Sequence, residues 1–411
     1  MTDRLYYHDS FLLEFDAQII GLVPSTASES RPALILDRTA FYPTSGGQVF
    51  DTGRLIGTDG KKVPVVEVAE RDDGTILHFL ESTAPALGSG THVHGEIDAP
   101  RRRDHIQQHS GQHVLSAAFI EQFGMPTVSF HMGEESCSID LEAKSLSAEQ
   151  VEAAERLSNE VIRDGRPVTV RFVTQDEARV LGLRKIPPLE RGELRLIEVQ
   201  NFDLTACGGT HVRNTSQIGC ILLRKTEKVK QGVRLEFVCG ERALATSRRD
   251  YKTLTEAAAI YSSHIWDLPQ QARKALDEAK SDRKAREQVL AELAALMAQQ
   301  LINETPTTGQ QKRVARVFSD RDLTFLKLLA QKLTRLAPDV IALLGSTADP
   351  PALVFAQSMG LPSDMGTLMK EALATLGGRG GGSKDMAQGG PASATQMAEV
   401  LNDLANNIPT S

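Results

Sequence analysis

The pattern of apolar and polar positions changes character several times along the chain. Within residues 1–95, apolar runs such as SFLLEF, ALILDRTAFYP and KKVPVVEVAE are separated by Gly, Pro and Asp turns. Short runs bounded by turn residues are typical of a small β domain. We therefore expect a small β-barrel-like domain over residues 1–95, with FYPTSGGQVFDTG as a loop inside it.

A helical period begins near Arg101 and ends at Gly124. The apolar residues at helical spacing are Ile106, Val114, Leu115, Ala118 and Phe119. A second helix begins at Ser147, which Gln150 follows at capping-box spacing. Four strands follow: PVTVRFVT, LRLIEVQNFDL, IGCILLRKTEKV and GVRLEFVCG. This order predicts a two-layer α+β domain over residues 96–240.

Residues 241–305 are predicted to be a helical spacer. An apolar seam of alternating three- and four-residue steps runs through Ala272, Leu276, Ala279, Leu290, Leu293 and Met297. A helical hairpin, a coiled coil between two copies and a helix packed on its own protein all fit this seam, which Arg283 and Arg286 interrupt.

After the linker-like NETPTTGQQ, residues 306–411 show strand-helix-strand order and a glycine-rich stretch, GGRGGGSKDMAQGG. This order predicts a small C-terminal α/β domain. The chain as a whole is therefore predicted to be an α+β multidomain protein.

Composition narrows the class of protein without naming a function. The chain has 411 residues, a formal net charge of −7 and four cysteines. Four scattered cysteines are too few for a disulfide framework, so metal binding or burial is expected for them. No run approaches the length of a membrane helix, and the N-terminus lacks the features of a signal peptide. We expect a cytoplasmic protein without membrane contact.

Two short motifs carry the candidate chemistry. HSGQH places His109 and His113 four residues apart on the predicted helix, where both imidazoles can face one ion. CGGTH places Cys207 and His211 at the same separation, and its two glycines permit a tight turn through positive backbone angles. Three imidazoles and one thiolate form a tetrahedral zinc set and disfavour magnesium and calcium. We expect one Zn2+ per chain.

The spacing leaves the use of this zinc open. A closed site with four protein ligands would be structural, whereas a catalytic zinc keeps a position for water or substrate. No carboxylate within either motif is an obvious general base. A metal that activates water and a metal that only positions a substrate are equally allowed.

Together with FYPTSGGQVFDTG and LEFVCGERA, the two motifs closely resemble the editing domain of alanyl-tRNA synthetases and freestanding alanyl-tRNA editing proteins. The stretch GGRGGGSKDMAQGG resembles the signature of the C-terminal domain of the same synthetases. In that family the two motifs supply the zinc ligands, which here implies His109, His113, Cys207 and His211.

The resemblance implies a long-form editing protein that acts in trans. Such a protein hydrolyses the ester of serine or glycine wrongly attached to alanine tRNA. About 100 residues precede the first motif histidine, which leaves no room there for an ATP-binding catalytic domain, so we expect no aminoacylation. The family places the glycine-containing loop near the active site, which implies Thr44, Gly46, Gly47 and Gln48; Ser45 stands where a third glycine is common.

Alanine is smaller than serine, so a synthetic pocket rejects serine poorly, and a second site that favours a hydroxyl can correct the error. Three polar residues are candidates for reading that hydroxyl: Thr44, Gln48 and Gln112. Ordinary hydrogen-bonded loop or helix positions are the alternative for each.

Basic clusters mark candidate contacts with tRNA phosphates. They are RRRDH, with Arg101, Arg102 and Arg103; LLRKTEKVKQGVR, with Lys225; and the glycine-rich stretch, with Arg379 and Lys384. Solvated surface charge, or a packing loop for the glycine-rich stretch, is the alternative. Homodimerisation through the spacer helices or the C-terminal domain also fits.

Three other classes of function stay open at this point. A phosphoesterase would need an Asp-His-His motif that DHI does not supply. A zinc-stabilised RNA-binding protein without catalysis would carry the same ligands. Redox sensing by Cys207 is a third class, which a bound metal would suppress.

Overall fold

The computed structural model describes residues 2–24, 31–81, 88–181, 183, 193–230 and 232–409. By the density of internal contacts the chain forms two compact units, Met1–Glu256 and Ala257–Ser411. The division into four domains and the three boundaries predicted from the sequence stay predictions. Among the described residues, none of the helices combines the length and apolar character needed to cross a membrane.

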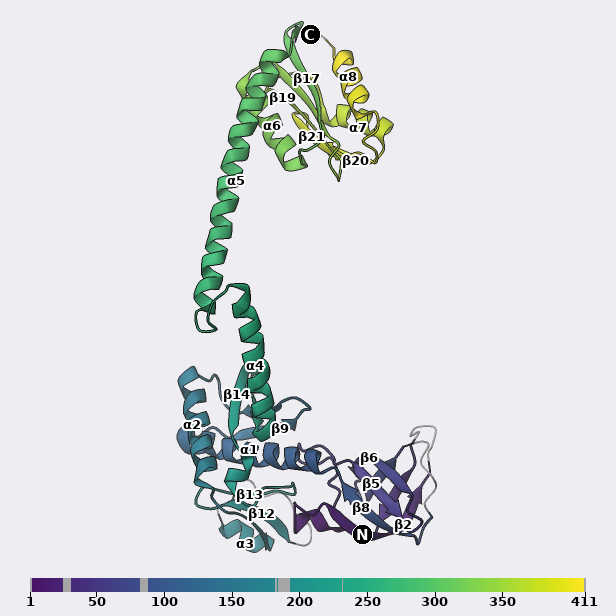
Figure 1. The fold of residues 1–411 in the computed structure, drawn as a ribbon, viewed down its shortest axis with the longest axis vertical. Coiled ribbons are helices and arrows are strands. Elements are labelled where there is room, and N and C mark those ends of the chain that lie inside the picture. The colour runs from purple at the N-terminus through teal and green to yellow at the C-terminus, as the bar shows by residue number, and fades with distance from the viewer. Residues whose placement is uncertain are drawn as a thin grey trace. The chain divides into compact units, whose positions relative to one another are not determined.

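The first unit begins with a closed barrel of six strands (Figure 1). In spatial order the strands are β2 (Glu14–Val23), β3 (Ala33–Leu36), β7 (Ile76–Leu80), β6 (Lys62–Glu70), β5 (Gly53–Gly57) and β8 (His92–Ile97). Apolar side chains such as Leu36, Leu55 and Val63 fill its interior. The barrel confirms the predicted small β domain. The loop from Tyr42 to Asp51, between β4 (Arg38–Thr39) and β5, lies outside the barrel strands.

Helix α1 (Ala99–Phe123) follows the barrel directly. Its N-cap Asp98 accepts a hydrogen bond from the Arg101 backbone N–H, and it ends at Gly124 in the left-handed conformation. Both ends follow ordinary capping chemistry. Most of α1 between His105 and Phe119 is buried, which places the HSGQH motif in the interior of the unit.

Two sheets complete the first unit. The four-stranded sheet contains, in spatial order, β14 (Ile221–Val229), β15 (Gly232–Cys239), β10 (Cys137–Leu141) and β9 (Thr127–Met132). One core joins this sheet to α1 and to α2 (Ala148–Asp164), which begins at the predicted Ser147–Gln150 capping box. The three-stranded sheet contains β11 (Val168–Val173), β12 (Leu194–Val199) and β13 (Asp203–Ala206).

The remaining short elements of this unit are β1 (Asp3–Arg4), the 3-10 turns Leu5–Tyr7 and Thr215–Ile218, and α3 (Gln175–Val180). Helix α4 (Gly240–Ile260) spans the boundary between the units, and α5 (Leu268–Glu304) belongs to the second unit. Both helices lie in the predicted spacer.

The second unit is a six-stranded mixed sheet covered by helices on both faces (Figure 1). Its strands, in spatial order, are β16 (Thr307–Thr308), β17 (Gln311–Phe318), β18 (Val340–Ser346), β19 (Ala352–Gln357), β21 (Met386–Gly390) and β20 (Arg379–Gly382). The end of α5 and α6 (Leu323–Leu336) share one core with the sheet, and α7 (Met365–Leu376) and α8 (Met397–Asn407) share the other. Residues of β18 alternate between the two cores, as a strand buried on both faces requires.

Two local predictions need correction in this unit. The predicted linker NETPTTGQQ, residues 303–311, includes the end of α5, strand β16 and the turn that leads into β17. The glycine-rich stretch contains the β20–β21 hairpin, so it is not the packing loop that was the alternative to a tRNA contact. A Cβ at Gly382 would lie 2.3 Å from the backbone oxygen of Met386, so the close approach of β20 and β21 requires a residue without a Cβ at this position.

His78 gives the barrel a defined response to acid. It is fully buried in β7, with Thr39 Oγ1 2.8 Å from its Nε2 and Leu34 O 3.1 Å from its Nδ1. Burial lowers the pKa of His78 from 6.5 to about 4. Protons therefore bind the unfolded state first, and His78 destabilises the fold as pH falls from 6.5 towards 4.

The free energy of unfolding should decrease between pH 7 and pH 5 in the parent and in a His78→Gln variant. We expect the decrease to be smaller in the variant, by about 2 kcal/mol, because the variant lacks the buried imidazole. Urea unfolding at both pH values measures this difference, and the pH 7 data correct for the substitution itself. Equal losses in both proteins would contradict the assignment.

Candidate metal centre

The four predicted ligands come together in the first unit. Helix α1 contributes His109 and His113, and the turn after β13 contributes Cys207 and His211. One potential ligand atom from each side chain lies within 4.8 Å of every other. Cys207 Sγ is 3.4 Å from His109 Nε2 and 3.3 Å from His211 Nε2. All but Cys207 are buried, and Cys207 is partly buried.

The turn reaches the helix because Gly209 lacks a side chain. A Cβ at Gly209 would lie 2.0 Å from His109 Cε1, a distance no real contact allows. Neither Gly208 nor Gly209 has a positive φ. The glycine is therefore needed for a close approach, and the positive backbone angles predicted from the sequence are not its reason.

Each imidazole has a partner near its other nitrogen. His109 Nδ1 lies 2.6 Å from Gln48 Oε1. His211 Nδ1 lies 3.3 Å from Ser110 Oγ. His113 Nδ1 lies 3.6 Å from an Asp203 carboxylate oxygen. Acceptors at Nδ1 favour the tautomer in which Nε2 carries the free lone pair, and metal-ligating histidines commonly have such partners.

Arg195 of β12 donates hydrogen bonds to the backbone of the CGGTH turn. Its side chain is 6% exposed, and its Nη1 donates to the carbonyls of Cys207, at 2.7 Å, and Gly209, at 2.9 Å. Its Nε donates to Tyr7 O at 2.9 Å, which connects the turn to the N-terminal segment. The guanidinium thus fixes the backbone that carries the thiol.

The side chains also set one another's charge. Burial alone would raise the pKa of the Cys207 thiol, but the imidazoles of His109, His211 and His113 hold that pKa well below its usual value. Burial opposes protonation of His113, yet Cys207 and Asp203 raise its pKa to about 9. Burial keeps the pKa of His211 well below its usual value. A thiolate among imidazoles is the donor set that suits zinc, so the residues present fit this ion.

A cavity of about 430 Å³ opens beside the cluster. His109, His113 and Cys207 line it, whereas His211 is not among the lining residues. The other walls combine polar and apolar side chains, including Tyr42, Gln112, Ser116, Ile120, Thr127, Val128, Ser129, Phe130 and Thr205. Gln112 Nε2 donates to Ser116 Oγ at 2.7 Å, and Ser116 Oγ lies 2.6 Å from Thr127 Oγ1. This hydroxyl chain forms a continuous polar wall.

Of the three predicted hydroxyl-reading residues, only Gln112 lines this cavity. Thr44 is exposed and is not among the lining residues. Gln48 is fully buried, and besides contacting His109 its Nε2 donates to Thr210 Oγ1 at 2.9 Å. The position of Gln48 points to holding a histidine instead of reading a substrate.

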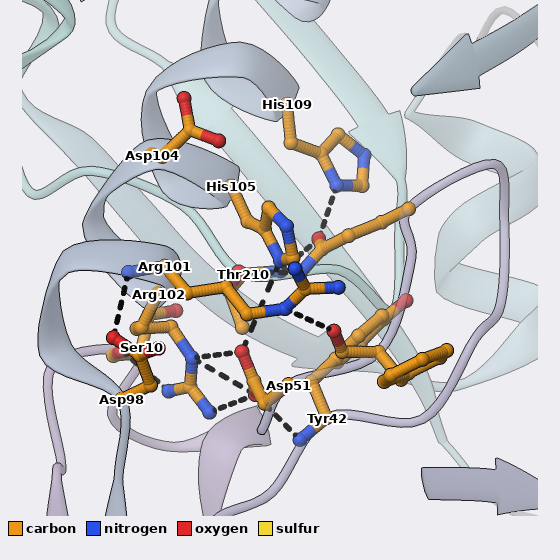
Figure 2. A network of polar contacts seen from close by, with 12 residues as sticks. Ser10, Tyr42, Asp51, Asp98, Arg101, Arg102, Asp104, His105, His109 and Thr210 are labelled. Atoms are coloured by element: carbon orange, nitrogen blue, oxygen red, sulfur yellow. Dashed lines mark hydrogen bonds and ion pairs between the residues drawn. The ribbon is translucent and has the colours of Figure 1, made fainter. Parts of the chain in front are cut away.

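The predicted phosphate contacts separate into buried and exposed groups. Arg102 is 1% exposed and pairs with Asp51, so its position contradicts a role in phosphate binding (Figure 2). Arg101 is half-buried, with its guanidinium over the Phe50 ring and Nε donating to Phe50 O. Arg103, Lys225, Arg379 and Lys384 are exposed. Arg103 lies 3.9 Å from Glu241, and Lys225 pairs with Glu227.

Sequence reasoning missed the residues that hold the ligands, chiefly Asp203, Ser110 and Arg195. It also missed Ser116, although a signal for Ser116 was present. Ser116 follows His109 and His113 at helical spacing and therefore shares their face of α1. Extending the HxxxH face by one turn would have found it.

Comparison with protein-family models defines the class of this chain. Residues 2–101 match the model of class II (A) tRNA synthetases. Residues 194–235, which include the CGGTH turn, match the second additional domain of threonyl and alanyl tRNA synthetases. Two segments of the first unit are therefore similar to domains of aminoacyl-tRNA synthetases.

Similarity to curated proteins extends over nearly the whole chain. The alanine–tRNA ligase of Pyrococcus furiosus is 32% identical over 99% of this chain and 44% of its own length. The ligase of Archaeoglobus fulgidus is 33% identical over 98% of this chain and 43% of its own length. The alanyl-tRNA editing protein AlaX-L of Pyrococcus horikoshii is 28% identical over 95% of this chain and 94% of its own length.

The chain thus spans less than half the length of the ligases it matches and nearly all of the editing protein. The resemblance predicted from the sequence is confirmed: this protein is a relative of the alanyl-tRNA synthetases and of the long alanyl-tRNA editing protein. Among solved structures, the C-Ala domain of the Aquifex aeolicus alanyl-tRNA synthetase covers 25% of this chain and 96% of its own, at 22% identity and a TM-score of 0.24.

The contact between Asp203 and His113 gives a test of the metal centre. We expect Asp203→Asn to weaken zinc binding by about 10- to 100-fold, because residues that orient a ligand histidine have effects of this size. Competition with a chromophoric chelator measures the affinity. Asp250→Asn, on the surface of α4, is the matched control and should bind zinc like the parent. Unchanged affinity in Asp203→Asn would show that the carboxylate does not orient His113.

Proposed function

We propose that this protein is a zinc-dependent hydrolase that removes wrongly attached amino acids from alanine tRNA. The observation that carries the proposal is that His109, His113 and Cys207 line a cavity of about 430 Å³. An ion held by residues at a cavity wall faces a space in which a substrate can bind. The likeness to an alanyl-tRNA editing protein along almost its full length supports this assignment.

The zinc ligands in this proposal are His109, His113, Cys207 and His211. When bound there, zinc would supply a Lewis acid that polarises an ester carbonyl or lowers the pKa of a water molecule. Gln48, Asp203 and Ser110 keep the three imidazoles oriented through their Nδ1 atoms. Arg195 keeps the turn that carries Cys207 in place.

The polar wall of the cavity is the proposed site of selection. Gln112, Ser116 and Thr127 form a hydrogen-bonded chain, and Ser129 and Thr205 add two more hydroxyls to the lining. A wall of this kind favours an amino acid with a hydroxyl over one that lacks it. We therefore propose Ser-tRNA(Ala) as the preferred substrate, with Gly-tRNA(Ala) as a second one and correctly charged Ala-tRNA(Ala) as a poor one.

Binding of tRNA is assigned to exposed cations. Arg103 and Lys225 in the first unit, and Arg379 and Lys384 at the glycine-rich hairpin, are accessible to phosphates. The buried Arg102 is not included. Homodimerisation and the division of the chain into four domains stay predictions. The absence of aminoacylation is also a prediction. Alanine-dependent exchange of pyrophosphate into ATP would contradict it.

One observation favours a second candidate function. Four protein ligands make a closed zinc site, which is typical of structural zinc. A zinc-stabilised RNA-binding protein without catalysis would therefore bind tRNA and zinc but release no amino acid.

Replacement of Cys207 separates these candidates. We expect Cys207→Ser to lower deacylation of Ser-tRNA(Ala) by at least about 100-fold, since the loss of a ligand should exceed the effect of losing an orienting partner. The assay follows release of serine, glycine and alanine from the three charged tRNAs. Cys220→Ser is the matched control, because Cys220 lies outside the cluster. Circular dichroism and tRNA binding check that the variants fold.

No release of any amino acid by a zinc-loaded parent that binds tRNA would contradict the hydrolase and support the non-catalytic protein. Equal deacylation activity in Cys207→Ser and the parent would show that the reaction does not depend on a zinc ion bound by Cys207.

The glycine-rich hairpin predicts a salt-dependent contribution to tRNA affinity. We expect Arg379→Gln combined with Lys384→Gln to weaken tRNA binding and to lower the slope of log affinity against log salt by about 2, or about 1 per lost phosphate contact. Filter binding between low and moderate salt measures both quantities. Arg335→Gln removes an exposed charge from α6 in the same unit and should leave the slope unchanged. An unchanged slope in the double variant would exclude these two residues as phosphate contacts.

A further inference from the structure

A buried ion pair joins the barrel to helix α1. Asp51 is 0% exposed and Arg102 is 1% exposed. Arg102 Nε lies 3.2 and 3.1 Å from the two Asp51 carboxylate oxygens, and Nη2 also contacts the carboxylate. The remaining guanidinium hydrogens reach Ser10 O, at 2.8 Å, and Ala40 O. A buried ion pair is weak evidence for stability by itself, so its location calls for another explanation.

Asp51 closes the base of the loop that begins at Tyr42. The Tyr42 backbone N–H donates to Asp51 Oδ2 at 2.7 Å, and the Asp51 backbone N–H donates to Tyr42 O at 3.0 Å. Nearer the tip, Ser45 and Gln48 exchange two backbone hydrogen bonds of 3.0 Å. The loop is thus internally braced and anchored at Asp51.

Gln48 connects this loop to both halves of the ligand set. Its Oε1 lies 2.6 Å from His109 Nδ1 on α1 and accepts from the Thr210 backbone N–H at 3.1 Å in the turn. Its Nε2 donates to Thr210 Oγ1. Gln48 is fully buried, so any other orientation of its side-chain amide would lose these hydrogen bonds without gaining bonds to water.

The spacing along α1 matches the spacing along the loop. Arg102, His105 and His109 lie at i, i+3 and i+7, on one face of the helix. Asp51 lies against Arg102 and has an oxygen 3.9 Å from His105 Nδ1 (Figure 2). Gln48, three residues earlier in the loop, contacts His109. Arg102 therefore fixes the register in which the loop meets the helix.

The charges favour Arg102 as the anchor. Burial lowers the pKa of His105 to about 4, so its imidazole is neutral near pH 7. Arg102 is the cation that pairs with the Asp51 carboxylate at hydrogen-bonding distance. The planar guanidinium also makes several bonds in fixed directions, which a single ammonium group cannot reproduce.

We propose that the Asp51–Arg102 ion pair is a positioning element of the metal centre. It holds the base of the loop so that Gln48 Oε1 meets His109 Nδ1, which leaves His109 Nε2 to face Cys207 Sγ. The inference rests on the proposed function only in that the four-residue cluster holds zinc.

The test uses a double-mutant cycle on the full chain, with zinc affinity measured by chelator competition. We expect Arg102→Lys to weaken zinc binding about 10-fold and Gln48→Leu by about 10- to 100-fold. Because Arg102 acts through Gln48, the combined variant should bind zinc like Gln48→Leu alone. Glu96→Gln, which removes the partner of Arg54 from an exposed ion pair of the barrel, is the control and should match the parent.

A second readout needs no metal. Long-range proton–nitrogen NMR of histidine-labelled, metal-free protein reports which nitrogen of His109 carries the proton. We expect Nδ1 to carry it in the parent and a mixture of tautomers in Arg102→Lys. Asp51→Asn, which keeps an acceptor for the Tyr42 N–H, takes the place of Arg102→Lys if that variant folds poorly.

The outcomes separate this inference from the proposed function. Parental zinc affinity and an unchanged His109 tautomer in folded Arg102→Lys would overturn the positioning role and leave the hydrolase intact. Additive losses in the cycle would also overturn it, because they would show an action independent of Gln48. A parent that binds no zinc would defeat the proposed function, while the tautomer would still decide the role of the ion pair.

Discussion

The candidate metal centre depends on the contact between the backbone of the CGGTH turn and the imidazole of His109. No side chain fits between them, because a Cβ at Gly209 would lie 2.0 Å from the ring. This contact lets ligand atoms from α1 and from the turn after β13 lie within 4.8 Å of one another. Gln48 holds the helix side of the contact, and Arg195 holds the turn side. A change that separates turn from helix would therefore remove the whole ligand set at once.

Burial and charge act together in this arrangement. A partly buried thiolate is costly alone, but the surrounding imidazoles favour it, and the Arg195 guanidinium donates to the backbone of its turn. The Nδ1 atoms of the three imidazoles face Gln48, Asp203 and Ser110, so their Nε2 atoms are free to converge on one point. Ligands that already point in the required direction lose little freedom when a metal binds. The polar partners around the cluster would thus raise its affinity for a metal without contacting the metal themselves.

The sequence predicts those elements whose apolar residues recur at the spacing of a strand or a helix. Strand and helix periods predicted the small β domain, α1 and most strands after α2. The predicted single strand LRLIEVQNFDL is two antiparallel strands, β12 and β13, and β9 and β10 were not predicted. The residues that contact the ligands are not marked by a periodic spacing. Gln48 is 61 residues from His109 in the sequence, and only the folded chain brings the two side chains together. Arg102 was misread because three consecutive arginines resemble surface charge. Yet Arg102 lies seven residues before His109 and therefore on the same face of the helix, whereas Arg101 and Arg103 lie on other faces. The sequence spacing alone is sufficient to separate Arg102 from its two neighbours.

The position of the cavity bears on whether a zinc ion here would serve structure or chemistry. A structural site is enclosed by its ligands, but three of these four line an open space and only His211 lies behind them. The polar wall continues from the ligands along the same face of α1, through Gln112 and Ser116. One buried helix therefore fixes two of the three ligand histidines, His109 and His113, together with Gln112 and Ser116 of the cavity wall. Sites in which reacting and selecting groups share a rigid element keep their relative geometry through substrate binding, which favours a catalytic centre over a purely structural one.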